Sequence, residues 1–158
     1  MSHAHNDGVP RLLVVHHTPS PATQEMLEAV LAGAKDDAIE GVEVVVRPAL
    51  SAAVVDVLEA DGYLLGTPAN IGYISGALKH FFDTIYYPVL EATKGRPFGA
   101  YVHSNLGAEG ALRAIDTITT GLGWSAVAPV MVVEGAVDKA DREALYELGA
   151  TVAATLSR

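Results

Sequence analysis

Short runs of apolar residues alternate along this chain with longer segments in which apolar residues recur every three or four positions. The short runs predict buried β-strands, and the longer segments predict amphipathic helices that pack on a sheet. Strands are predicted at residues 11–16, 42–47, 62–66, 97–103 and 126–133. In the second of these, Glu43 and Arg47 alternate with valines, which is typical of a strand at the edge of a sheet.

The predicted helices have recognisable starts. Ser20 is suited to cap the first helix and Pro21 to its first position, and Asp138 is suited to cap the last. A short helix is expected near residues 52–58, one after residue 75 that Pro88 ends or kinks near Tyr87, and one over 107–122. Three inward-facing stripes are predicted: Met26, Ala29, Val30, Gly33 and Ala34; Leu78, Phe81, Phe82 and Ile85; Leu145, Leu148, Val152 and Leu156.

Five strands with helices between them predict an α/β fold with a parallel sheet covered on both faces, because each parallel pair needs a crossover connection. The length of 158 residues suits one such domain. We expect a polar N-terminal tail over residues 1–10 and the domain over residues 11–158. The sequence contains no internal repeat and no linker.

Composition narrows the possible functions. The chain has no cysteine, which excludes disulfides, thiolate metal sites and a cysteine nucleophile. The formal net charge of −9 argues against nucleic acid as a partner. No apolar run reaches the roughly 20 residues of a membrane span, and the polar start lacks the apolar stretch of a signal peptide. We therefore expect a cytoplasmic protein without a membrane partner.

Candidate chemistry lies in three loops that follow strands: 17–23, 67–75 and 104–108. In open α/β sheets ligands bind beyond the carboxyl ends of the strands, and all three loops leave that edge. Each loop is rich in Gly, Pro, Ser, Thr or Asn, and the first has no Lys or Arg. A phosphate there would be held by amides, hydroxyls and a helix N-terminus.

Other folds of this topology lack their key residues here. A receiver domain needs acidic residues after the first strand and an Asp ending the third, where this chain has His16, His17, Gly66 and Thr67. A low-molecular-weight phosphatase needs a loop cysteine. The P-loop and the GxGxxG fingerprint are also missing. The flavodoxin-like group is left.

The segment 66–83 (GTPANIGYISGALKHFFD) resembles the third-strand loop and helix of NAD(P)H-dependent FMN reductases and quinone oxidoreductases. The loop 17–23 is similar to the FMN phosphate loop of flavodoxins, although Pro19 and Pro21 remove amide donors, and 104–108 lies where a third flavin-facing loop is found. The resemblance covers nearly the whole chain from Arg11. It implies FMN as cofactor and a three-layer flavodoxin-like fold with a five-stranded parallel sheet in order 2-1-3-4-5.

The same resemblance implies a set of cofactor-binding residues. Around the phosphate it implies His17, Thr18, Ser20, Ala22 and Thr23. Along the ribityl chain and ring edge it implies Thr67, Pro68 and Ala69. Against the isoalloxazine it implies Asn70, Ile71, Gly72 and Tyr73, and on the other side of the ring Ser104, Asn105 and Gly107. We expect FAD to bind more weakly than FMN, because a phosphate at a helix N-terminus leaves little room for an adenylate.

Two functions of different kinds follow. Tyr73 is the one aromatic residue in 67–75 and 104–108 has none, so a sparsely covered ring favours an enzyme that passes electrons from NAD(P)H through FMN to a quinone or similar acceptor. The alternative is a flavodoxin-type electron carrier for redox proteins, which the acidic charge favours. A degenerate domain without flavin is a third reading. The sequence leaves open whether the electron donor is NADH or NADPH. It also leaves open whether the protein forms a homodimer.

No residue is singled out as a catalytic acid or base, which fits a reaction whose chemistry the flavin carries. His16, His17 and His103 end strands at the ligand edge. A shared metal site is one interpretation, and ordinary loop histidines are the one we favour. No metal is predicted.

Overall fold

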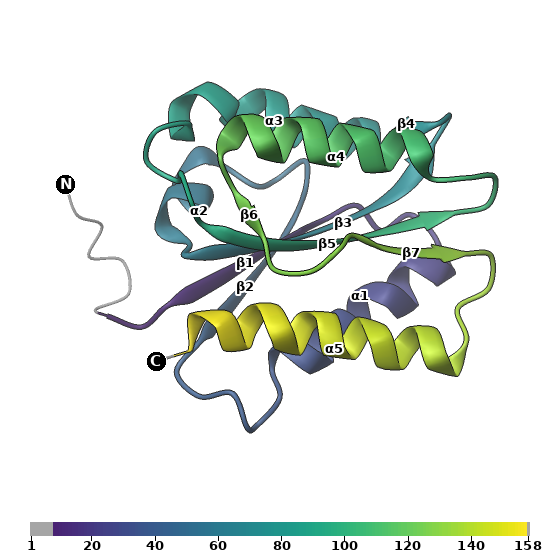
Figure 1. Cartoon of the computed structure of the whole chain (residues 1–158), viewed down its shortest axis with the longest axis horizontal. Helices are drawn as coiled ribbons and strands as arrows, with labels where there is room; N and C mark the ends of the chain where they lie inside the picture. The colour runs from purple at the N-terminus through teal and green to yellow at the C-terminus, as the bar shows by residue number, and fades with distance from the viewer. Residues whose placement is uncertain (1–7, 158) are drawn as a thin grey trace.

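A mainly parallel sheet lies between two layers of helices in the computed structural model of the chain, which describes residues 8–157 (Figure 1). The sheet contains β1 (Arg11–His16), β2 (Glu43–Pro48), β3 (Gly62–Asn70), β4 (Tyr73–Ile74), β5 (Pro97–Ser104), β6 (Ser125–Ala126) and β7 (Met131–Glu134). Its order is β2-β1-β3-β5-β6, with β7 also paired to β5. The α/β class and the predicted order are confirmed, with β6 and β7 together in the place of the fifth strand.

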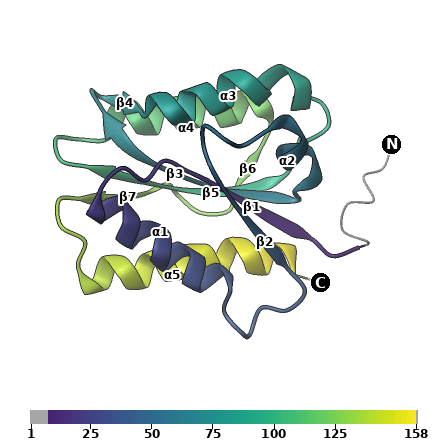
Figure 2. The ribbon, with the colours of Figure 1, turned by 180° about the vertical axis from the view of Figure 1, so that it is seen from behind.

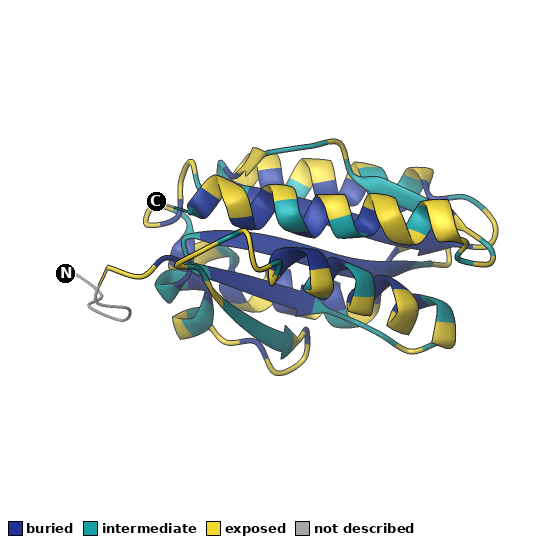
Figure 3. Ribbon diagram, turned by 90° about the horizontal axis from the view of Figure 1, so that it is seen from below, coloured by how far each residue is buried: buried dark blue, intermediate teal, exposed yellow. Residues whose placement is uncertain are grey.

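The helices form the two outer layers (Figure 2). One layer contains α1 (Pro21–Ala34) and α5 (Lys139–Leu156), and the other contains α2 (Val54–Glu59), α3 (Gly76–Val89) and α4 (Glu109–Leu122). Successive strand residues face opposite layers: Leu64 packs on the α1 and α5 side, and Leu65 on the other. The central strands are almost entirely buried, and the outward sides of the helices are exposed (Figure 3).

Local sequence signals place the starts of α1 and α5 as predicted, whereas α2 and α4 begin two residues later than expected. The Ser20 side chain accepts a hydrogen bond from the Thr23 amide, and Pro21 is the first residue of α1. Asp138 caps α5 by accepting from the Asp141 amide at 2.8 Å. The stripes predicted on α3 and α5 are buried, and on α1 only Ala29 is partly exposed.

The third strand is longer than predicted. We expected it to end at Gly66 and a loop to begin at Thr67, but β3 continues to Asn70, with Pro68 opposite His103 of β5. It then turns back into β4, where Ala69 faces Ile74. Pairing with β5 and, further on, with β4 extends the strand. The prediction ended it too early because Gly, Pro and Asn in this segment favour a loop.

The fifth predicted strand is interrupted. Residues 127–130 separate β6 from β7, and Pro129 lies in the break because it has no amide hydrogen for the ladder. The helix with Pro88 ends two residues later than expected, since α3 continues to Val89 instead of ending near Tyr87. Of the predicted tail, residues 1–7 lie outside the described part of the chain. Pro10 is buried, and its carbonyl accepts from the Glu43 amide at 2.9 Å.

Candidate functional site

The carboxyl edge of the sheet carries a cavity of about 450 Å³, within the range of small-ligand sites. Four segments supply its wall: the start of α1, the end of β3, the end of β5 and the loop between β7 and α5. The lining residues are Pro19, Ser20, Pro21, Ala22, Pro68, Ala69, Asn70, His103, Ser104, Asn105, Gly135 and Ala136. The topology therefore brings segments that are far apart in the sequence to one cavity.

The first turn of α1 contributes a free amide to this wall. The Ser20 hydroxyl accepts from the Thr23 amide at 3.2 Å, and the Thr23 hydroxyl in turn accepts from the Ser20 amide at 3.1 Å. Pro21 has no amide hydrogen. Ala22, at the second helical position, has an amide without an intrahelical acceptor. An amide and a helix dipole at this point suit an anion.

The hairpin of β3 and β4 fixes the second segment. Thr67 is fully buried; its hydroxyl donates to the Pro68 carbonyl at 2.7 Å and accepts from the Ser75 amide at 3.0 Å. The turn places Ile71 at φ 48° and Gly72 at φ 74°. A positive φ is unfavourable for a β-branched residue, and the Ile71 side chain is completely exposed. Ile71 and Gly72 at the tip lie outside the cavity, and Pro68, Ala69 and Asn70 of β3 line it.

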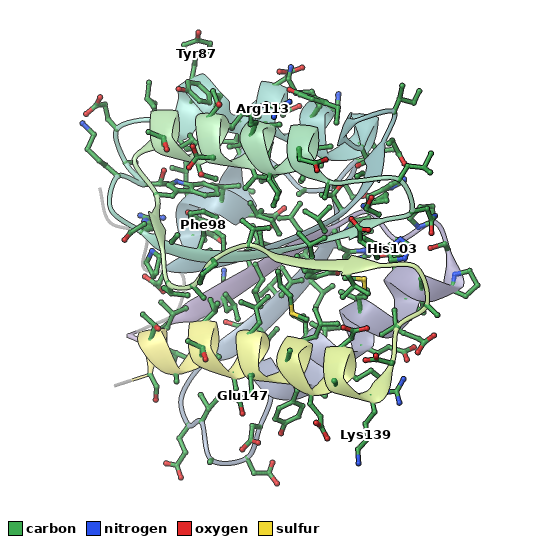
Figure 4. All side chains as sticks on the ribbon, turned by 45° about the vertical axis from the view of Figure 1, so that its right-hand side comes forward. Tyr87, Phe98, His103, Arg113, Lys139 and Glu147 are labelled. Carbon is green, nitrogen blue, oxygen red and sulfur yellow. The ribbon has the colours of Figure 1, made fainter. Side chains whose placement is uncertain are left out.

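The end of β5 contributes a buried serine and a histidine. The Ser104 hydroxyl accepts from the amides of Leu106 and Gly107, at 3.2 and 2.7 Å, and retains one hydrogen to donate. His103, at the end of β5 beside β7 in Figure 4, lies 2.8 Å through Nε2 from the Gly135 carbonyl. Because a carbonyl only accepts, Nε2 carries the hydrogen, and this bond ties the third and fourth segments together.

The wall is electrically neutral apart from the titratable His103. None of the lining residues is Asp, Glu, Lys or Arg. Below the edge, burial and then the neighbouring His17 lower the pKa of His16, which keeps that ring uncharged near neutral pH. This donor set, made of amides and hydroxyls at a helix start, fits a phosphate held without a cation.

The structure brings about half of the predicted cofactor-binding residues together. In the wall lie Ser20, Ala22, Pro68, Ala69, Asn70, Ser104 and Asn105. Outside it lie His17, Thr18, Thr23, Thr67, Ile71, Gly72, Tyr73 and Gly107. The Thr23 and Thr67 side chains are buried, and their hydroxyls bond within the protein. Within residues 8–157 no three His, Asp or Glu side chains cluster as metal ligands.

Sequence reasoning missed the contribution of the loop after β7 and assigned no site role to His103. Gly135 and Ala136 follow a parallel strand and therefore reach the same edge as the other loops. That rule, applied to the fifth strand, would have found them. The role of His103 depends on the carbonyl of Gly135, whose position only the folded chain defines.

A larger cavity of about 910 Å³ lies between the outer faces of α1 and α5. Its lining includes four glutamates (Glu25, Glu28, Glu143 and Glu147) together with Lys139 and Arg142, and Lys139 points away from α5 into solvent (Figure 4). Arg142 pairs with Glu25 at 3.5 Å. Four carboxylates disfavour a phosphate, so the smaller cavity at the sheet edge is the better candidate for an anionic ligand.

A doubly wound sheet with a neutral cavity at the N-terminus of α1 defines the class of flavodoxin-like nucleotide-binding proteins. A family model described as NADPH-dependent FMN reductase matches residues 17–141. The chain belongs to this family, and FMN is its cofactor. No helix within residues 8–157 is long and apolar enough to cross a membrane.

Individual relatives include flavodoxins, and the solved structures share the fold. A flavodoxin of Aquifex aeolicus (strain VF5) is 39% identical over 75 residues, which are 48% of this chain and 40% of that protein, so the chain matches less than half of this curated relative. A flavodoxin from the domain Archaea superposes with a TM-score of 0.78 at 19% identity, over 92% of this chain and 98% of that one. A WrbA-like flavodoxin from Agrobacterium tumefaciens gives 0.76 at 22% identity, over 93% and 97%.

Proposed function

We propose that the protein is a cytoplasmic oxidoreductase that takes electrons from NAD(P)H onto FMN and passes them to a quinone or similar small acceptor. One observation carries the proposal: no Phe, Tyr or Trp side chain lines the cavity at the sheet edge. Tyr73, on the neighbouring hairpin, is about two-fifths exposed and outside the wall. A flavin ring that is not enclosed by aromatic side chains leaves space for a nicotinamide to stack on it.

In this proposal the residues of the wall bind and orient the cofactor. The Ala22 amide and the Ser20 hydroxyl hold the phosphate at the start of α1, with His17, Thr18 and Thr23 around them. Bound FMN supplies the redox chemistry. Pro68–Asn70 and the hairpin residues 71–73 would hold the ring from one side, and Ser104, Asn105 and Gly107 would hold it from the other.

Hydride transfer needs close contact between the donor carbon and the ring more than it needs an acid or base. The wall offers no free acid or base, because His103 is its one titratable side chain and its Nε2 is already bonded to the Gly135 carbonyl. We therefore assign no catalytic residue of the protein.

The second candidate is an electron carrier for redox proteins. The net charge of −9 favours it, since acidic surfaces attract basic partners. The relatives named flavodoxin are in keeping with such a role.

The two candidates differ in how FMN bound to the protein responds to nicotinamide. We expect NADH or NADPH, without a helper reductase and in the absence of oxygen, to bleach the visible absorbance of the FMN-loaded protein, and a soluble benzoquinone to restore it. If dithionite bleaches the bound FMN but NADH and NADPH do not, the protein is an electron carrier.

Tyr73→Ala distinguishes two roles of this side chain. If Tyr73 shields the ring, the variant is bleached faster by NADPH than the parent. If it stacks on the acceptor, quinone turnover falls while FMN binding stays nearly unchanged. If neither NADH nor NADPH bleaches the bound FMN of the parent or of the variant, the proposed oxidoreductase function is wrong.

A further inference from the structure

The hydroxyl of Tyr101 is buried without a hydrogen-bond partner. Among the described residues its Oη is the one buried side-chain nitrogen or oxygen that makes no bond. The side chain is 1% exposed, and burial raises the pKa of its phenol above the ordinary value, so the hydroxyl keeps its hydrogen. An unpaired buried donor is costly and needs an explanation.

Tyr101 lies under the candidate site. It belongs to β5 and faces the layer of α1 and α5, where it packs in the core with Met26 of α1. Its ring extends across Gly66 of β3, since a side chain at Gly66 would overlap both Cζ and Oη of Tyr101. Only glycine at position 66 leaves room for the hydroxyl to reach this point.

The strand register fixes the depth of that hydroxyl below the cavity. Gly66 pairs with Tyr101 on one side and with His16 on the other, so the three residues form one row across the sheet. Two residues further toward the carboxyl edge, on the same face, Pro68 pairs with His103, and both line the cavity. The Tyr101 hydroxyl, which lies over Gly66, is therefore one row beneath the cavity, on the sheet face that α1 and α5 cover.

The neighbouring histidine does not satisfy this donor. His16 bonds through Nδ1 to the Thr18 hydroxyl at 2.7 Å, and no hydrogen bond links its ring to Tyr101. Tyr101 belongs to an apolar core cluster that also contains Val14 of β1 and Leu64 of β3. The cavity begins one row above, at Pro68 and His103, and a ligand bound there can supply the acceptor that the protein lacks.

We propose that Tyr101 is a positioning residue of the FMN site, whose hydroxyl donates, directly or through one water, toward the phosphate end of the bound cofactor. This rests on the proposed placement of the phosphate at the start of α1. Binding then relieves an unpaired donor that the empty protein carries. Part of the free energy of FMN binding would then come from a hydrogen bond that the buried Tyr101 hydroxyl lacks in the free protein.

Tyr101→Phe tests this, because it removes the O–H and keeps the ring over Gly66. We expect the dissociation constant for FMN to rise about five- to tenfold, the effect of one hydrogen bond, and that for riboflavin, which has no phosphate, to stay within about twofold. The urea midpoint of the empty protein should equal or exceed that of the parent. Both ligands are titrated by quenching of flavin fluorescence.

Tyr63→Phe is the matched control. Tyr63 is equally buried, but on the opposite face, and its hydroxyl donates to the Val57 carbonyl at 2.7 Å and accepts from Arg96 at 3.2 Å. Removing it should lower the midpoint of the empty protein and leave FMN binding unchanged. The two tyrosines should therefore show opposite patterns of stability and affinity.

Three outcomes overturn the inference. Tyr101→Phe that binds FMN as the parent does would show that the hydroxyl plays no part in binding. An equal loss for riboflavin and FMN would place its effect at the ring, and a lower midpoint of the empty variant would mean that the phenol already has a partner. A parent that binds riboflavin as tightly as FMN would instead contradict the proposed phosphate site itself.

Discussion

Pro19, in the loop after β1, and Pro21, at the first position of α1, remove two amide hydrogens from this end of the helix. The capping box uses another, because the Thr23 amide donates to Ser20. Ala22 is left as the amide of this helix start that can reach a ligand in the cavity. An anion here depends on single residues to an unusual degree, so individual substitutions should have measurable effects.

His16 should make the stability of the protein sensitive to mild acid. Burial and the neighbouring His17 lower its pKa in the folded chain, whereas in the unfolded chain it titrates at about 6.5. Below that pH the unfolded state binds more protons, so the free energy of unfolding falls as the pH falls. His16→Gln should lose less stability than the parent between about pH 7 and pH 5.

Urea midpoints at both pH values measure this difference. Asp36 and Asp138, whose pKa values are lowered by hydrogen bonds, titrate in a more acidic range and do not interfere. Equal losses in parent and variant would show that His16 takes up its proton as easily in the folded chain as in the unfolded one.

At the scale of elements, the start of α1 has two tasks. The same Ser20 hydroxyl that caps the helix also lines the cavity. Helix stability and cofactor binding are thus joined in one side chain, which separate measurements of unfolding and affinity can resolve.

Ser20→Ala should reduce the free energy of unfolding by about 1 kcal/mol, the contribution of an N-cap, and should also weaken FMN binding. Ser75→Ala is the matched control, since Ser75 caps α3 by accepting from the Leu78 amide at 3.1 Å but is not part of the cavity wall. We expect a similar loss of stability with unchanged affinity. Equal FMN affinity in both variants would remove Ser20 from the phosphate site.

The contact between the hairpin and α4 can be tested through a glycine. A side chain at Gly110, in the first turn of α4, would overlap the Gly72 carbonyl oxygen at the tip of the hairpin. Gly110→Ala should therefore displace the hairpin and weaken FMN binding. Gly76→Ala, at the first position of α3 with open space around it, should leave binding unchanged. Calorimetric titration of both variants with FMN makes the comparison, and equal affinities would mean that the hairpin does not touch the cofactor.

For the whole molecule the decisive property is its charge. A protein of net charge −9 repels an anionic nicotinamide and attracts a basic protein, and salt screens both effects. If the protein is an oxidoreductase, the second-order rate of its reduction by NADPH should rise with ionic strength. Stopped-flow measurements in increasing sodium chloride test this, and a rate that falls with salt would contradict it.

The sequence predicted much of the fold because the signals are local. Alternation of apolar runs, caps at Ser20 and Asp138 and the polar edge strand each depend on neighbours within a few residues. The extension of β3 to Asn70 could not be predicted in this way. It depends on pairing with His103 of β5 and with Ile74 of β4, and the local residues Gly, Pro and Asn favour a loop.

By itself the sequence determined the α/β class through its patterning, because each parallel pair of strands needs a crossover connection. Its resemblance to the flavodoxin-like family gave the order of the strands, and the rule for open α/β sheets predicted the edge at which a ligand binds. The tertiary structure decided which side chains at that edge are available. Thr23 and Thr67 look like ligands in the sequence, but their hydroxyls bond within the protein. Gly135 and Tyr101 gain their importance only from residues that the folded sheet brings beside them, His103 and Gly66, and such neighbours are set by packing across the sheet.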